Sequence, residues 1–287
     1  MTRTDSKSTL PAGVKIARIN YDDDDGQPLV SALQGQQFLI ITLSVFAPPD
    51  THSKLVKAAA KAGIPYIMPN VFGFDTQNKS LREEDLYSAD SVQRCAEIES
   101  LGVSYIAMVC GFWYEWSLAL GEPWFGFDFK NKKVTFFDDG KTLINTSTWR
   151  QCGRALAALL SLPESSASPA VSQWKNKPFY LASFRISQRD MLDSIHRVTG
   201  STDKDWDITY EPTAQRYKNG IDEMQKGAMT GRAKAMYSRT FFPNGDGDYE
   251  SSRGLVNDLI GLPKDDLDEA TKRAVEMVES GWNPFAQ

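Results

Sequence analysis

Few groups of side chains in this sequence have the spacing that a known chemistry requires. The two histidines, His52 and His196, have no partners at metal-ligand spacing, which argues against a zinc site. The sequence also lacks the G-x-S-x-G turn that carries the nucleophile of α/β-hydrolases. Segment 244–248 (NGDGD) begins like a calcium loop, but Tyr249 and Leu255 stand where that loop needs glycine and glutamate. We therefore expect no metal centre, no serine-hydrolase site, and a plain loop at 244–248.

Two loops are better placed for chemistry, because each follows a predicted parallel strand. Residues 37–44 and 64–69 are predicted to be strands, and the first is almost continuously apolar, as in a strand covered on both faces. An amphipathic helix at about 51–62 joins them into a right-handed βαβ unit. Ligands of open parallel sheets bind at the carboxyl ends of the strands. The loops 42–44 (TLS) and 69–73 (PNVFG) are therefore the expected place for a ligand.

Length, charge and cysteine content narrow the class of protein. The 287 residues suffice for one large α/β domain, or for a domain with a smaller lobe. A net charge of −5 argues against a protein that follows a nucleic-acid backbone. No apolar run is long enough to span a membrane, and residues 1–13 lack the apolar stretch of a secretory signal. The odd number of cysteines (Cys95, Cys110 and Cys152) favours reduced thiols and a cytoplasmic location.

Strands and helices alternate along the rest of the chain. A strand at 14–20 and a short helix at 28–33 precede the βαβ unit, and a helix at 83–102 and a strand at 103–109 follow it. The later predictions are a hairpin of 132–137 and 141–145, a helix at 149–162 capped by Thr146 or Ser147, strands at 178–184 and 207–211, and helices at 189–199, 214–226, 231–238 and 265–280. This alternation predicts a doubly wound α/β fold with a smaller C-terminal part.

Several stretches carry a family resemblance. They are residues 2–23, 54–64 (KLVKAAAKAGI) leading to 67–75 (IMPNVFGFD), 111–116 (GFWYEW) and 136–149 (FFDDGKTLINTSTW). Together they resemble the NmrA-like and isoflavone-reductase-like branch of the atypical short-chain dehydrogenases/reductases, and in particular its fungal members. The similarity covers nearly the whole chain. PNVFG stands where that family carries a Pro-Ser-Glu-Phe-Gly type of motif.

The resemblance implies a Rossmann-like, doubly wound parallel sheet and NADP(H) as the cofactor. The expected domains are an NAD(P)-binding domain over 1–162, with an aromatic cover at 112–145, and a segment over 163–287 whose strands return to the sheet before a helical substrate lobe. The family binds NADP(H) through a glycine-rich turn after its first strand. This sequence has no such turn, and it begins where the family's second strand would end. Three explanations stay open: a segment missing upstream of the sequence as given, a natural loss of dinucleotide binding, or a sheet that closes differently.

The remaining cofactor residues are assigned from the resemblance, position by position. Arg3 would face the adenosine 2′-phosphate, and Tyr21 and Asp22 would flank the adenine. Their alternatives are a solvated terminal arginine and an acidic entry to the helix at 28–33. The nicotinamide half of the cofactor would lie along Thr42, Leu43, Ser44, Pro69, Asn70, Val71 and Phe72. The substrate residues would be Gly111, Phe112, Trp113 and Trp116, although aromatic residues such as Phe72 and Trp113 equally fit a packed core.

The catalytic residues depart from the family pattern. Plant reductases of this family use a lysine at the start of the helix that corresponds to about 88–101. Here the sequence reads YSADSV from Tyr87, with neither that lysine nor a Tyr-x-x-x-Lys pair. The plant mechanism is therefore not carried over. Tyr87, Asp90 and Tyr114 remain as candidate proton donors by position, with a surface cap or a core hydroxyl as the alternative.

Two functional hypotheses follow. The first is an NAD(P)H-dependent oxidoreductase of secondary metabolism that acts on a small aromatic or apolar molecule. The second is a non-catalytic, NmrA-like regulator or redox sensor, or a cofactor-independent member that has lost dinucleotide binding. In both cases we expect a small-molecule ligand, no contact with nucleic acid or membrane, and a possible homodimer.

Overall fold

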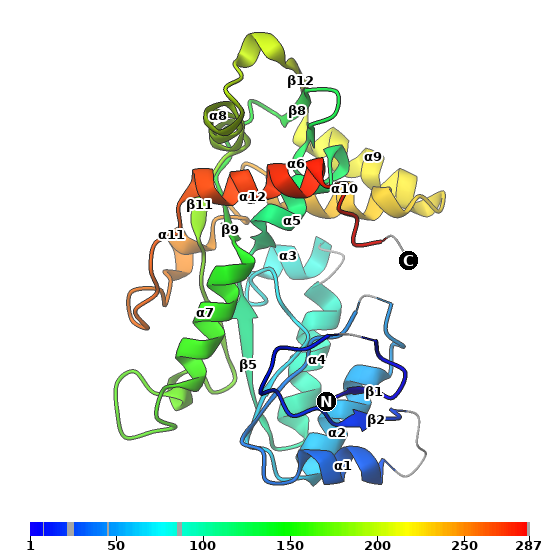
Figure 1. Cartoon of the computed structure of the whole chain (residues 1–287), viewed down its shortest axis with the longest axis vertical. Coiled ribbons are helices and arrows are strands. Elements are labelled where there is room, and N and C mark those ends of the chain that lie inside the picture. The colour runs from blue at the N-terminus through cyan, green and yellow to red at the C-terminus, as the bar shows by residue number, and fades with distance from the viewer. Residues whose placement is uncertain (8, 22–25, 45, 85–87, 286–287) are drawn as a thin grey trace. The chain divides into compact units, whose positions relative to one another are not determined.

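The computed structural model describes residues 1–7, 9–21, 26–44, 46–84 and 88–285 (Figure 1). The chain forms two compact units, and each unit is assembled from separate stretches of sequence. Unit 1 comprises Met1–Val71, Asp90–Met108 and Trp174–Pro178, and unit 2 comprises Phe72–Ala89, Val109–Gln173 and Phe179–Gln287. Among the described residues, no helix is long and apolar enough to cross a membrane.

Parallel strands form the centre of unit 1. The sheet has the order β10-β5-β4-β3, with β3 at Phe38–Ile40, β4 at Tyr66–Met68, β5 at Ser104–Val109 and β10 at Lys177–Tyr180. Phe38 lies opposite Tyr66, and Tyr66 in turn lies opposite Ser104, both in parallel register. The predicted pairing of the first two of these strands is thus confirmed. Every residue of β4 and β5 is buried, which explains why their sequences are apolar without alternation.

Helices cover the sheet of unit 1 and supply its core. They are α1 (Gln27–Leu33), α2 (Thr51–Lys61) and α4 (Ser88–Ser100). Leu55 and Val56 of α2 are almost completely buried, and they belong to the same apolar cluster as residues of α1 and α4. Burial of each such side chain stabilises the fold by about 1.5–3 kcal/mol. A small parallel sheet of β1 (Thr2–Arg3) and β2 (Arg18–Ile19) also belongs to unit 1, and Ile19 joins the same cluster.

Unit 2 contains two further sheets. One has the order β11-β9-β6, from β6 (Phe112–Trp113), β9 (Ile144–Ser147) and β11 (Phe184–Ile186). The other has the order β12-β8-β7, from β7 (Phe127–Asp128), β8 (Lys133–Phe137) and β12 (Asp207–Glu211).

The hairpin predicted at 132–145 is wrong, because β8 and β9 lie in different sheets. Gly140 does adopt positive φ after β8, as an Asp-Gly turn requires. However, β8 pairs along its whole length with β12, in parallel, and with β7 on its other side. Both edges of β8 are therefore occupied, and β9 pairs with β6 and β11 instead.

The helices of unit 2 are α3 (Lys79–Glu84), α5 (Tyr114–Ala119), α6 (Glu122–Phe125), α7 (Trp149–Leu160), α8 (Gln188–Thr199), α9 (Thr213–Gln225), α10 (Met229–Thr240), α11 (Tyr249–Arg253) and α12 (Leu267–Glu279). Ser187 caps α8 in a capping box with Asp190. The cap of α7 is Thr148, whose hydroxyl accepts from the backbone N–H of Gln151 at 3.0 Å. The prediction of Thr146 or Ser147 was therefore one or two residues early.

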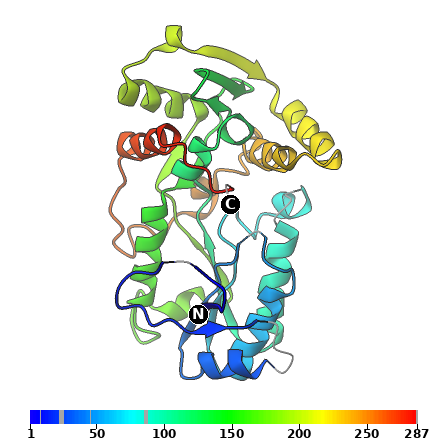
Figure 2. The ribbon, with the colours of Figure 1, turned by 45° about the vertical axis from the view of Figure 1, so that its right-hand side comes forward.

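Helices α9 and α10 form a closely packed antiparallel pair (Figure 2). Gly220 of α9 lies at their crossing, where an added Cβ would stand 2.5 Å from the backbone nitrogen of Ala235. Real Cβ atoms do not approach backbone that closely, so the helix spacing requires a glycine at this position.

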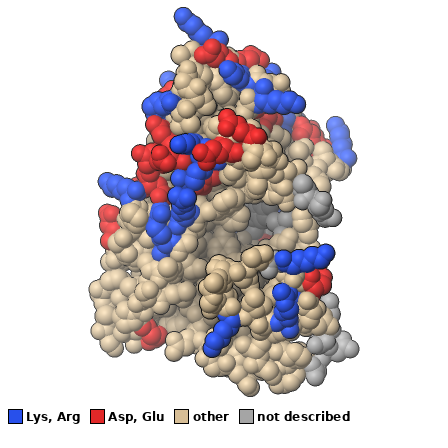
Figure 3. All heavy atoms as spheres, in the orientation of Figure 1, with Lys and Arg blue, Asp and Glu red and all other residues tan. Residues whose placement is uncertain are grey.

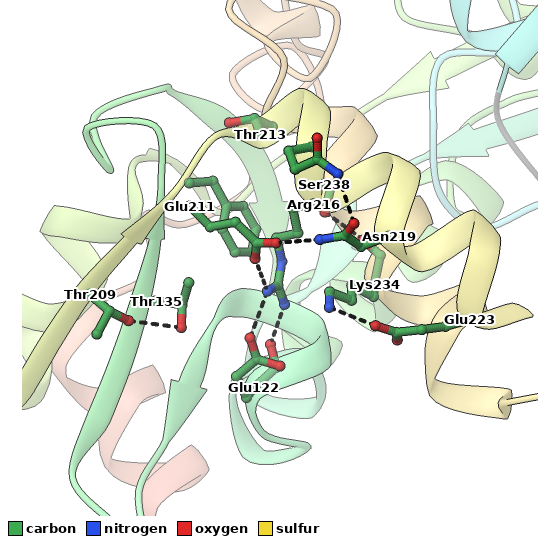
Figure 4. Close-up of polar contacts among 12 residues, drawn as sticks. Glu122, Thr135, Thr209, Glu211, Thr213, Arg216, Asn219, Glu223, Lys234 and Ser238 are labelled. Carbon is green, nitrogen blue, oxygen red and sulfur yellow. Dashed lines mark hydrogen bonds and ion pairs between the residues drawn. The ribbon is translucent and has the colours of Figure 1, made fainter.

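A buried arginine ties α9 to its surroundings (Figure 4). The side chain of Arg216 is 1% exposed, and its guanidinium donates to Glu122 Oε1 at 2.6 Å and to Glu211 Oε2 at 2.9 Å. It also lies over the ring of Phe137, 4.4 Å from the ring centre. Because the two carboxylates come from α6 and β12, this cation joins three elements of unit 2.

Candidate functional site

The carboxyl ends of β3 and β4 in unit 1 are held together by one side chain, that of Asn70. Its amide oxygen accepts from the backbone N–H of Leu43 at 3.1 Å, and its amide nitrogen donates to the Leu43 carbonyl at 3.3 Å. Asn70 follows β4 and Leu43 follows β3, so the two loops predicted to face a ligand are linked directly. Both residues were predicted from the sequence as cofactor residues.

His52, in the first turn of α2, is the second component of this site. Its Nε2 accepts a long hydrogen bond of 3.4 Å from the backbone N–H of Asn70. An imidazole whose Nε2 accepts must carry its proton on Nδ1 when neutral. That Nδ1 is buried and has no hydrogen-bond partner among the described residues. Burial, with a smaller effect from Arg94, lowers the pKa of His52 to about 4, so the ring is neutral at physiological pH.

Arg94, on α4, completes the cluster. Its guanidinium donates to the Asn70 carbonyl at 2.7 Å. All four polar groups of Asn70, two from its backbone and two from its side chain, are thus engaged by His52, Arg94 and Leu43. Asp90 is exposed in the first turn of α4, one turn before Arg94 on the same helix face. The loops are therefore fixed in position by contacts from two helices.

The other predicted cofactor residues of unit 1 differ in their exposure. Thr42 and Ser44 are exposed beside Leu43, and the Ser44 hydroxyl accepts from the Phe46 N–H at 3.2 Å. Pro69 and Val71 are buried on either side of Asn70, where the Val71 N–H donates to the Pro69 carbonyl at 2.7 Å. Only the two hydroxyl residues therefore present side chains that a ligand could reach freely.

The residues predicted to face adenosine lie in or next to the small parallel sheet of β1 and β2. Arg3 is exposed and forms a 3.5 Å ion pair with Asp5. Tyr21 lies near Arg3 and is half-buried, and burial raises the pKa of its phenol more than the charge of Arg3 lowers it. Asp22 falls outside the described residues, as does the candidate proton donor Tyr87.

In unit 2, Gly111 and Phe112 are packed rather than open. Gly111 has positive φ, and an added Cβ would meet the Asn145 carbonyl oxygen at 2.2 Å. The ring of Phe112 stacks on that of Tyr237 with 3.5 Å between centroids. The cavity beside them has a volume of about 10 Å³, which is room for one water molecule. These two predicted substrate residues therefore leave no space for an organic molecule in this arrangement.

Tyr114 is a core hydroxyl, the alternative that its sequence position also allowed. Its side chain is completely buried, and its hydroxyl shares a 2.7 Å hydrogen bond with Thr271. Burial raises the pKa of this phenol further above its usual value. In this arrangement the Tyr114 hydroxyl lies inside the core, away from any solvent-exposed ligand.

Trp113 and Trp116, together with the half-buried Phe72, are the predicted residues of unit 2 that keep part of their surface open. The two indoles meet edge to face, 6.3 Å apart. Trp113 also contacts Trp149, and Trp116 contacts Trp124. They belong to a continuous aromatic cluster at the surface of this unit.

Sequence reasoning missed His52 and Arg94 as members of the site. The sequence pattern raises His52 only as a metal ligand. Among the described residues, no group of three or more ligating side chains could hold a metal ion. Its place one residue into the helix after β3 was the available signal, because that helix start faces the carboxyl edge of the sheet.

Comparisons with known proteins identify relatives in sequence and in fold. No protein-family model matches the chain. The curated oxidoreductase aprR of Aspergillus flavus is 25% identical over 276 residues, which cover 94% of this chain and 86% of the relative. Among solved structures, one of the pinoresinol-lariciresinol and phenylcoumaran benzylic ether reductases aligns with a TM-score of 0.70 and 18% identity, over 91% of this chain and 82% of that chain. The NADPH-dependent quinone oxidoreductase QOR2 of Escherichia coli, in complex with NADPH, gives 0.64 and 18%, over 92% and 84%.

The chain therefore has the Rossmann-like α/β fold of these solved structures, as predicted. Within that class, the chain resembles the NmrA-like and isoflavone-reductase-like proteins in fold, and it is related in sequence to a fungal oxidoreductase.

Proposed function

We propose that this protein is an NADP(H)-dependent oxidoreductase that acts on a small aromatic or apolar molecule. The observation that carries the proposal is the Asn70 cluster, which fixes the loops after β3 and β4 at the edge of the sheet where Rossmann-like proteins bind their ligands. The sequence relationship to an oxidoreductase over almost the whole chain supports the same reading.

The residues present fit part of a dinucleotide. Thr42 and Ser44 offer exposed hydroxyls in the segment that leads from β3 to α2, and backbone N–H groups at a helix start attract phosphate oxygens. Arg3 offers an exposed guanidinium that suits a 2′-phosphate, which supports NADP(H) over NAD(H). The sequence supplies no glycine-rich turn for the pyrophosphate. When bound, the cofactor would supply the hydride, and the residues of this chain would bind and orient it.

A second function has its own support. With Tyr114 sealed in the core, the one candidate proton donor within the described residues is Asp90, which is exposed on α4. A protein that binds a dinucleotide without turning it over needs no proton donor. The alternative proposal is therefore a non-catalytic, NmrA-like regulator with the same cofactor site.

Calorimetric titration of the purified chain tests the proposal. We expect NADPH to bind at one site and NADH to bind more weakly, and we expect Arg3→Gln to reduce this difference while leaving NADH binding unchanged. Lys7→Gln, which changes a nearby exposed charge, is the matched control. Absence of binding by both dinucleotides would reject both proposed functions. Binding without NADPH oxidation across a panel of quinones and other aromatic acceptors would favour the regulator.

A further inference from the structure

The carboxyl ends of β5 and β10 meet in unit 2. Asn176 donates its backbone N–H to the Tyr105 carbonyl at 2.9 Å. Further along both segments, Leu181 donates to the Val109 carbonyl at 2.9 Å, so β5 and β10 run in the same direction. Gly73, which follows β4, forms a parallel bridge with Val109. Ligands of open parallel sheets bind outside the carboxyl ends of the strands, so side chains at this edge are placed to hold one.

A buried carboxylate, that of Asp75, lies at this edge. Asp75 is 2% exposed, and its Oδ1 accepts from the backbone N–H of Gln77 at 2.8 Å. The same oxygen accepts at 2.7 Å from the hydroxyl of Tyr180, the last residue of β10. Burial and this hydrogen bond raise the pKa of the Tyr180 phenol, which therefore keeps its proton and remains a donor. The other oxygen, Oδ2, accepts from Arg253 Nε at 3.0 Å.

Arg253, the last residue of α11, is held through one nitrogen. Its side chain is 41% exposed, and its hydrogen bond to Asp75 uses Nε. The two Nη groups have no hydrogen-bond partner among the described residues. A guanidinium presents its N–H groups as a rigid, planar fork that matches the two oxygens of a carboxylate. The buried aspartate therefore fixes one side of an exposed guanidinium and leaves its remaining donors available.

The protein as a whole does not attract anions. Its net charge is −5, and acidic and basic side chains are interspersed over the face drawn in Figure 3. An anion is therefore held here by local donors and not by a broad positive field. Asp75 is buried and its oxygens already accept three hydrogen bonds, so an incoming group meets the donors of Arg253 instead of the carboxylate.

From these observations we propose that Arg253 binds the carboxylate of a small organic acid, and that Asp75 is its positioning residue. The two Nη groups donate to the two oxygens of the ligand, while Asp75 holds Nε. Binding at Arg253 requires no cofactor. The substrate class that follows, an aromatic carboxylic acid, rests on the oxidoreductase function proposed for the protein.

Benzoate and benzamide test this proposal, because they share one ring and similar size but differ in charge. NMR spectroscopy of the isotope-labelled full chain, without cofactor and at constant ionic strength, observes the Arg253 Nε–H signal. Arg253→Met assigns that signal by its disappearance. We expect benzoate to shift the signal in a saturable way and to bind roughly tenfold more tightly than benzamide. Equal affinities for the two probes, or a signal that benzoate leaves in place, would overturn the proposal.

Arg253→Met should also weaken benzoate binding by about tenfold or more, as measured from the signals of benzoate itself. Arg197→Met is the matched control, since Arg197 is likewise exposed but its Nε and Nη2 are both engaged by Asp268. This control should bind benzoate like the wild type. Wild-type affinity in Arg253→Met would contradict the assigned donor.

Asp75→Asn separates the position of the guanidinium from its charge. The amide N–H₂ then faces Arg253 Nε, a donor against a donor, so Arg253 keeps its charge but loses its support. We expect benzoate to bind roughly fivefold more weakly. If this variant does not fold, Arg253→Lys takes its place, because it keeps the charge without the fork and should likewise bind benzoate more weakly. A folded variant of either kind with wild-type benzoate affinity would refute the positioning role.

NADPH titration of Arg253→Met distinguishes this proposal from the proposed function. Arg253 belongs to unit 2 and the proposed cofactor residues belong to unit 1, so we expect wild-type NADPH affinity. Benzoate binding at Arg253 in a protein that does not bind NADPH would support the carboxylate site and reject the oxidoreductase. NADPH binding in a protein that does not bind benzoate would reject the carboxylate site alone.

Discussion

The amide of Asn70 pairs with both main-chain groups of Leu43, at 3.1 and 3.3 Å, in the manner of two neighbouring strand residues. The pairing extends the contact between β3 and β4 beyond the last residues of the strands. It places the ligand-facing loops of unit 1 in a defined arrangement, since the same residue is also held by His52 and Arg94.

Replacement of Asn70 by leucine should loosen this arrangement. The Leu43 N–H and carbonyl lose their partners, so we expect the free energy of unfolding to fall by about 1–3 kcal/mol, together with weaker NADPH binding. Urea denaturation and calorimetry measure the two effects. Ser44→Ala is the control for stability, because Ser44 is exposed and its loss should change the free energy of unfolding by less than about 0.5 kcal/mol. Wild-type stability in Asn70→Leu would contradict the role of the amide pair.

His52 should make the stability of the protein depend on pH. The folded protein lowers the pKa of His52 from 6.5 to about 4, so between these values the unfolded chain binds the proton more readily. The stabilisation from neutral His52 is therefore complete above about pH 6.5 and is lost as the pH falls toward 4. The difference corresponds to about 3 kcal/mol. We expect His52→Gln to lose less stability than the wild type over this interval in urea denaturation.

Proton NMR provides an independent check, because the chain has only two histidines. His196→Gln assigns the remaining imidazole signal to His52. That signal should stay at its neutral position down to about pH 5 and then begin to move, consistent with the lowered pKa. A titration midpoint near 6.5 would contradict the buried, neutral ring.

Arg216→Met should be among the most destabilising single substitutions in unit 2. It leaves the carboxylates of Glu122 and Glu211 facing a partly buried site without their cation. Breaking a buried pair in this way costs about 3–5 kcal/mol. Arg197→Ala is the matched control, since Arg197 and Asp268 are both largely exposed and their ion pair contributes less than about 1 kcal/mol. Thermal denaturation should separate the two variants clearly, and similar losses in both would refute the buried-cation argument.

Two glycine-to-alanine substitutions should have opposite signs. Gly220→Ala places a Cβ against the backbone of α10, and such overpacking should cost about 1–3 kcal/mol. Gly153→Ala, inside α7, meets no atom within 4 Å and should stabilise the protein by roughly 0.5–1 kcal/mol through helix propensity. Urea denaturation measures both. A stabilised Gly220→Ala would mean that α9 and α10 are not packed at that distance.

The sequence predicted the central part of the fold because its signals were local. The apolar run at Phe38 and the amphipathic helix from Thr51 each specify one element, and short connections then bring β3 beside β4. The hairpin at 132–145 failed for the opposite reason. The partner of β8 is β12, about seventy residues further along the chain, and no local pattern reports such a pairing.

The candidate site was predictable to a similar extent. Leu43 and Asn70 follow from the rule that ligand loops lie at the carboxyl ends of parallel strands. The contacts of Asn70 with His52 and Arg94 depend on how α2 and α4 pack on the sheet. The sealed position of Tyr114 depends likewise on Thr271, which lies 157 residues away in the sequence. Tertiary packing determines both.

The most direct test of the account is NMR spectroscopy of the isotope-labelled chain during titration with NADPH, observed at the backbone amides of Leu43 and Asn70. We expect both signals to shift in a saturable way, and we expect Asn70→Leu to weaken the affinity derived from the Leu43 signal. Signals that stay in place at saturating NADPH would show that the carboxyl edge of this sheet does not bind the cofactor.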